Sequence, residues 1–282
     1  MHLRDFSALA RIVDVRYPSN RSIVTIAGAG GAGTVLFRFL TDAGDPMLWG
    51  FRVAVAVFLG WAIARELDPD HPWSAAVAGP LAGLGVAMAV PELGAAAGFL
   101  IATRIVARST GMSAHRWELV GLVGFVGYLA ASREAWPAAL ALVWALWIDG
   151  GHPHATHPPS RVAAAGAAIV AAVVVVVTFP SGFELDRGWG STVVFLIGIG
   201  AGWVSINRLR PPSSTGDHDK EPLSPHRLAQ ARLLAGAGLG FAAILTTASP
   251  ATHASLWTAT VAVAIVSLRP ETQNNALDNL RR

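Results

Sequence analysis

The segment ARELDPDHPW, residues 64 to 73, is the densest run of charge in the chain, and its candidate functional residues are Arg65, Glu66, Asp68, Asp70 and His71. Oxygen ligands at alternating positions suit a divalent cation such as Mg²⁺ or Ca²⁺ better than zinc. One interpretation is therefore a polar cluster at the cytoplasmic face that binds such a cation, or a phosphorylated substrate through it.

The same segment also has the composition of a turn between two helices. Pro69 and Pro72 prevent the preceding helix from continuing, and Asp68 and Asp70 can accept hydrogen bonds from backbone N–H groups of the turn. Glu66 is expected at the membrane surface, where a charge costs little. The paired aspartate-rich motifs of membrane prenyltransferases and the signature of CDP-alcohol phosphotransferases are absent. The turn is the preferred interpretation.

A second polar loop, IDGGHPHATHPPSR at residues 148 to 161, carries His152, His154 and His157. Imidazoles this close can ligate a transition metal. Its glycines and prolines make a pliable loop, so these histidines are weak metal candidates, and we expect neither a metal nor a cofactor. Whether this loop meets ARELDPDHPW is left open.

Several glycines have spacings that invite a functional interpretation. GAGGAG, residues 28 to 33, matches a dinucleotide-binding pattern, but no strand–helix–strand unit can be built around it. We interpret it as a surface for close helix packing. The same interpretation covers Gly198 with Gly202 and Gly236 with Gly240.

The composition is that of a membrane protein. Of the 282 residues, 53% are hydrophobic and 14% charged, against about a quarter charged in soluble domains. No cysteine is present, which excludes disulfides and thiolate chemistry. The sequence predicts an all-α polytopic transmembrane bundle of about ten spans, at 22–40, 48–64, 73–90, 93–107, 118–132, 135–149, 162–180, 190–206, 228–247 and 253–268.

The positions of the basic residues predict how these spans are oriented. Most of the 21 Lys and Arg residues fall on loops of one side, and the other side receives only Arg38, Arg133 and Arg187. Because basic loops stay in the cytoplasm, both termini are expected there, in the cell membrane.

Three regions are expected along the chain. Residues 1–21 form an interfacial amphipathic segment, residues 22–268 the transmembrane domain with a flexible cytoplasmic loop at 208–227, and residues 269–282 a cytoplasmic tail. The likeness of residues 50–69 to 190–211 suggests a weak parallel repeat of four, two and four helices.

The function that best fits this composition is a permease or lipid-handling protein for a neutral or lipid-like solute. No carboxylate falls near the middle of a span, which argues against coupled ion transport. The alternative is a non-catalytic accessory subunit of a larger membrane complex. An enzyme at the cytoplasmic face is the third reading. The expected partners are the lipid bilayer and a membrane protein or second copy; no nucleic acid is expected.

Overall fold

The computed structural model describes residues 7–11, 13–151, 159–179, 189–217, 221–246 and 249–269. Within these ranges the regular elements are ten α-helices and two short 3₁₀ helices. The helices are α2 (Pro18–Thr41), α3 (Pro46–Leu67), α4 (Pro72–Val86), α5 (Leu93–Ala107), α6 (Arg116–Ala130), η1 (Arg133–Ala135), α7 (Trp136–Gly150), α8 (Pro159–Thr178), α9 (Trp189–Asn207), α10 (Pro225–Leu245), η2 (Pro250–His253) and α11 (Ala254–Ser267).

The starts of these helices follow from local sequence. Helices α2, α3, α4 and α10 each begin at a proline, whose missing N–H is not needed in the first turn. The side chain of Asp45 accepts a hydrogen bond from Leu48 N at 3.1 Å and caps α3. Ser224 caps α10 in the same way. Each of the ten apolar runs predicted from the sequence corresponds to one of these helices.

The helices differ in whether they can cross a membrane alone. Four are long and apolar enough: Pro18–Thr41, Pro46–Leu67, Pro159–Thr178 and Pro225–Leu245. Helices α4, α5, α6 and α7 have 15 residues each, about 22 Å of rise against a hydrocarbon core of about 30 Å. The described part of the chain is thus all-helical, with four helices suited by length and composition to spanning a membrane; the expected count of about ten spans is not confirmed.

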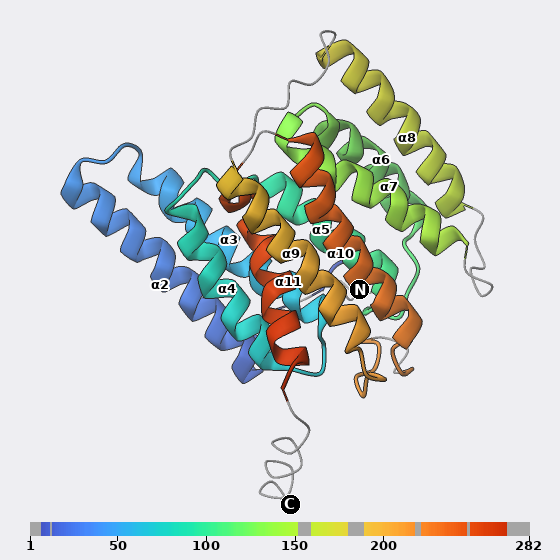
Figure 1. Cartoon of the computed structure of the whole chain (residues 1–282), viewed down its shortest axis with the longest axis horizontal. Coiled ribbons are helices and arrows are strands. Elements are labelled where there is room, and N and C mark those ends of the chain that lie inside the picture. The colour runs from blue at the N-terminus through green and yellow to red at the C-terminus, as the bar shows by residue number, and fades with distance from the viewer. Residues whose placement is uncertain are drawn as a thin grey trace, which may run out of the picture.

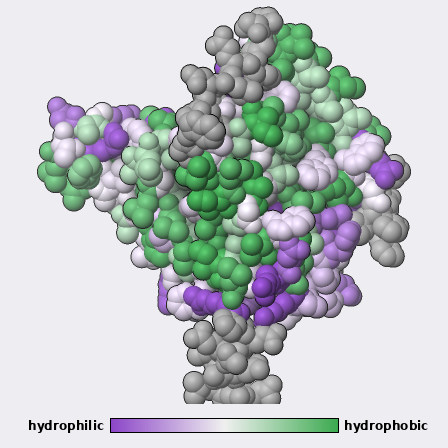
Figure 2. Space-filling view, viewed as in Figure 1, coloured by the Kyte–Doolittle hydropathy of each residue, from purple (hydrophilic) through white to green (hydrophobic). Residues whose placement is uncertain are grey.

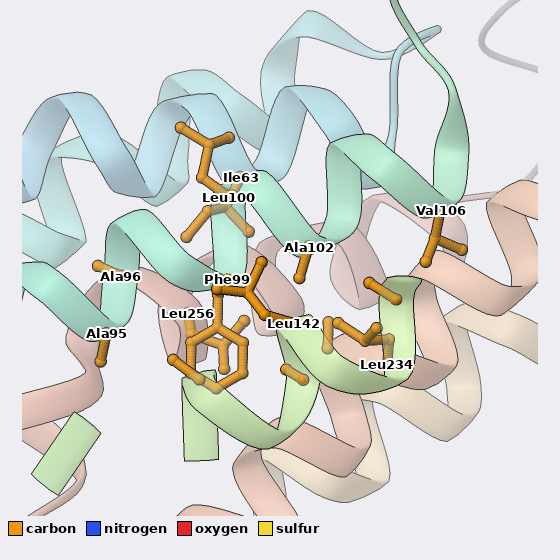
Figure 3. Close-up of a cluster of buried hydrophobic side chains, with 14 of the residues drawn as sticks. Ile63, Ala95, Ala96, Phe99, Leu100, Ala102, Val106, Leu142, Leu234 and Leu256 are labelled. Atoms are coloured by element: carbon orange, nitrogen blue, oxygen red, sulfur yellow. The ribbon is translucent and has the colours of Figure 1, made fainter. Parts of the chain in front are cut away.

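The bundle is organised around α5, which packs against α3, α7 and α10. Helices α2 and α8 lie at opposite margins (Figure 1). The side chain of Phe99 on α5 is fully buried, and Leu142, Leu234 and Leu256 lie near it (Figure 3). Small residues let the neighbouring backbones approach: a Cβ on Gly202 would stand 3.0 Å from Gly236 Cα, which confirms close packing of α9 on α10.

The N-terminal segment and the loop before α10 are both fastened to the bundle. Residues 7–11 and 13–17 are not helical, and Leu9 N donates to Glu118 Oε1 at 3.1 Å. In the loop expected to be flexible, Gly216 N donates to Glu221 O at 2.8 Å, and Asp217 N donates to Ser109 O at 3.2 Å. The described parts of both segments therefore make specific contacts with the helix ends.

Candidate functional site

The charged segment at residues 64 to 73 forms the turn between α3 and α4, as the sequence predicts. Helix α3 ends at Leu67 and α4 begins at Pro72. Arg65 Nη1 donates to Pro69 O at 3.1 Å, which closes the turn. We call the end of the bundle that holds this turn the polar end, because buried carboxylates and arginines from several helices meet there.

Glu66 is buried at the polar end. It is 2% exposed, so other parts of the chain enclose its carboxylate, which the sequence alone did not indicate; its position at the membrane surface stays a prediction. Its Oε1 accepts a hydrogen bond from Arg104 Nε at 2.9 Å and faces Arg11 Nη1 at 3.4 Å. Arg104 Nη1 donates to Leu9 O at 2.8 Å. Burying a carboxylate is costly unless it is paired, and these two arginines provide the pairing.

Asp68 is also buried, 3% exposed, and links the turn to α10. Its Oδ1 lies 2.8 Å from His71 Nδ1 and 3.6 Å from Arg232 Nη2. Arg232 Nε donates to Leu67 O at 2.9 Å, and its Nη1 donates to Ser205 O. Arg232 therefore joins the end of α3 to the end of α9.

Asp70 reaches the loop before α10 instead of the backbone of its own turn. It accepts hydrogen bonds from Ser213 N and Ser214 N, both at 2.9 Å, and from the Ser214 hydroxyl. Burial raises the pKa of Asp70, but the hydrogen bonds from Ser214 and Ser213 outweigh it, so the pKa lies below its usual value. Of the candidates, Asp68, Asp70 and His71 are brought together, while Glu66 points to a different set of partners.

The sequence reasoning did not identify Asp149 as part of a buried cluster. Asp149 is 3% exposed, and its Oδ1 accepts hydrogen bonds from Arg108 Nε at 3.0 Å and Arg227 Nη2 at 3.3 Å. Ser160 Oγ donates to Oδ2 at 3.3 Å. Arg227 is 6% exposed and also donates to Val106 O at 3.0 Å. The cluster ties α5, α7, α8 and α10 together.

The described residues at the ARELDPDHPW turn do not form a metal site. Within the described ranges, no group of three or more His, Asp or Glu residues is placed to hold a metal ion. His152, His154 and His157 lie outside the described residues. The carboxylates of the polar end are instead paired mainly with guanidinium groups, which suits a structural role.

Two hollows of more than 400 Å³ lie among the described helices. One is a groove of about 410 Å³ between α7, α8 and α10, lined by Leu140, Val143, Trp144, Trp147, Ala164, Ala165, Ala168 and Phe241. The other, of about 470 Å³, lies where α9 and α11 end and is lined by Asn207, Arg208, Leu209, Arg210, Ser267, Leu268 and Arg269. The first is apolar and the second carries three guanidinium groups, so they suit different ligands.

The His71–Asp68 pair predicts a pH dependence of stability. The hydrogen bond to Asp68 raises the pKa of His71 above its ordinary 6.5, against the effects of burial and of Arg232, with the charge of Asp70 adding to the increase. The protonated ring is thus favoured in the folded protein. This stabilisation is present below the ordinary pKa and is lost as pH rises through the folded pKa.

At pH 6 we expect His71→Gln to melt at a lower temperature than the wild type. The difference between their melting temperatures should shrink as the pH rises above the folded pKa of His71. Thermal unfolding in detergent across this range measures the difference between the two proteins. An unchanged difference at every pH would show that the pair does not titrate as described.

Comparison of the chain with protein-family models, with curated proteins and with solved structures finds no match.

Proposed function

We propose that this chain is a multi-pass membrane protein that handles a lipid or a neutral lipid-like solute. The observation that carries the proposal is the groove between α7, α8 and α10, whose lining is apolar and includes two tryptophans. A hydrocarbon chain is the ligand that gains most from such a lining.

A charged side chain next to this groove offers a place for a lipid headgroup. Arg161 lies over the ring of Trp147, 5.4 Å from its centroid. Arg161 is exposed and stands at the start of α8. Phe241, which lines the groove, lies near the end of α10. A lipid with its chain along the groove and its polar part near Arg161 satisfies both surroundings.

The test is native mass spectrometry of the full chain extracted gently from its own membrane. We expect retained lipid, and Ala168→Leu, which fills the groove, to lower the retained amount at least severalfold. Ala172→Leu is the matched control, because Ala172 is exposed on the same helix but does not line the groove. Unchanged lipid in Ala168→Leu, or a stoichiometric protein partner in place of lipid, would favour the accessory-subunit alternative.

We further propose that the ten helices cross the membrane with both termini on the cytoplasmic side. The short helices then span a locally thinned bilayer or extend into the interfacial region. Because the chain has no cysteine, single cysteines report topology cleanly. Thr215 is exposed at the polar end, and Thr41 is exposed at the far end of α2.

Thr215→Cys is expected to react with an impermeant maleimide only in inside-out vesicles, and Thr41→Cys only in right-side-out vesicles. Both variants keep their helices intact, because the first lies in a loop and the second at a helix end. Labelling of both cysteines from one side would contradict this orientation.

A further inference from the structure

The polar end carries a second hollow that the lipid groove does not include. The groove of about 470 Å³ at the ends of α9 and α11 adjoins a smaller cavity of about 80 Å³ beside the α3–α4 turn. The two share the lining residues Arg208, Leu209, Arg210, Ser267 and Arg269. Figure 2 shows hydrophilic residues gathered at the lower end of the molecule, where α9 ends and α10 begins.

The charge of the larger hollow points to an anion. Arg208 and Arg269 are exposed, and neither has a carboxylate partner within the described part of the chain. They place two like charges around one groove, an arrangement that an anion stabilises, and Arg210 lines the same groove. The planar guanidinium fork matches the oxygens of a phosphate. Asn207 Nδ2 donates to Trp203 O at 3.0 Å and keeps a second N–H for a phosphate oxygen.

The smaller cavity offers an independent second contact. Asp68 lines this cavity and is 3% exposed. Its Oδ1 is occupied by His71 and Arg232, while its Oδ2 has no hydrogen-bond partner among the described residues. A carboxylate oxygen accepts hydrogen bonds and cannot donate them, so a ligand that satisfies it must carry a hydrogen-bond donor such as a hydroxyl group.

We propose that the two connected hollows bind a polyol phosphate, a phosphate ester whose alcohol carries free hydroxyl groups. The phosphate contacts Arg208, Arg210 and Arg269, and a hydroxyl of the alcohol donates to Asp68 Oδ2. This chemistry exists in a phospholipid headgroup, such as that of phosphatidylglycerol, and in a soluble ester, such as glycerol 3-phosphate. The exposed indole of Trp73 at the edge of the cavity suits a site at a membrane interface.

The proposal does not rest on the apolar groove, since Trp144, Trp147 and Ala168 line only that other surface. The two can be tested apart, because Ala168→Leu leaves the arginine-lined groove unchanged. Asp68 itself is not substituted in the test, because it also pairs with Arg232 and its loss would disturb the fold. The headgroup is varied instead.

The experiment measures binding of added lipid to the detergent-solubilised full chain by native mass spectrometry. Phosphatidylglycerol is compared with phosphatidylmethanol of the same acyl chains, which keeps the charged phosphate and lacks the hydroxyls. We expect phosphatidylglycerol to bind about tenfold more tightly, because a hydrogen bond to a charged group contributes about that factor. Arg208→Gln with Arg269→Gln is expected to weaken phosphatidylglycerol binding by about tenfold or more.

The matched control is Arg16→Gln with Arg21→Gln, which removes the same charge from exposed positions at the start of α2. It is expected to leave binding unchanged. Glycerol 3-phosphate is titrated separately. If it binds as tightly as the lipid, and if Arg208→Gln with Arg269→Gln abolishes this binding, the same site takes a soluble ligand. Equal binding of the two lipids, or equal effects of the two double variants, would overturn the proposal.

Discussion

Asp149→Asn is expected to lower the free energy of unfolding by about 3–5 kcal/mol, the usual consequence of removing one partner from a buried ion pair. Asp149 is 3% exposed and Arg227 6% exposed, so the loss of the carboxylate charge leaves a guanidinium group buried without compensation. Arg108 loses the same negatively charged partner, whose Oδ1 lies 3.0 Å from its Nε. Unfolding of the purified protein in detergent by a titrated denaturing detergent measures the change.

Two variants identify the cause of this loss. Asp42→Asn is the control for removing a carboxylate, since Asp42 is exposed at the far end of α2 and asparagine tolerates its left-handed backbone. Its effect is expected within about 0.5 kcal/mol. Adding Arg227→Met to Asp149→Asn removes the uncompensated charge and should restore part of the stability. A loss for Asp149→Asn no larger than for Asp42→Asn would show that the buried pair does not support the fold.

The positions of the helices could be predicted from the sequence because apolar runs and prolines are local signals. All ten predicted runs correspond to helices, and α3 ends and α4 begins on either side of the ARELDPDHPW turn. The number of membrane crossings was not equally accessible. The predicted runs 93–107 and 253–268 closely match the lengths of α5 and α11. A helix of 14 or 15 residues, however, rises only about 21–22 Å against a hydrocarbon core of about 30 Å, so its apolar pattern does not show whether it crosses the bilayer.

The polar end was harder to predict because its pairs join residues far apart in the chain. Arg108 and Arg227 stand 41 and 78 residues from Asp149, and Ser214 stands 144 residues from Asp70. Periodicity shows which face of a helix is polar and does not show which other helix it meets. The available signal was the position of each charged residue near a predicted helix end on the same side of the membrane.

The glycine patterns show the same limit at the level of packing. GAGGAG lies inside α2, as the packing interpretation requires, yet only part of it makes a close contact. A Cβ on Gly31 would lie 2.9 Å from Gly50 O, whereas a Cβ on Gly28 or Gly33 would meet nothing within 4 Å. Small size makes close packing possible, and the neighbouring helix decides where it occurs.

Gly238→Ala is expected to lower the free energy of unfolding by about 1–3 kcal/mol, the usual cost of adding a methyl group to a filled core. A Cβ at this position on α10 would collide with Phe99 Cε1 and stand 2.9 Å from its Cζ. Phe99 is fully buried, and Leu142, Leu234 and Leu256 lie near its ring, so it has little room to move (Figure 3). Thermal or denaturant unfolding in detergent measures the loss.

Gly240→Ala, two residues further along α10, is the matched control. The nearest atom to its new Cβ is Ile199 Cδ1 at 3.8 Å, an ordinary contact. This variant should be neutral or stabilising by up to about 1 kcal/mol, because alanine favours the helix over glycine. Phe99→Leu in the Gly238→Ala background should recover part of the loss, since the smaller side chain makes room for the methyl group. If both alanine variants have the same effect, the close contact between α5 and α10 does not limit the packing of the core.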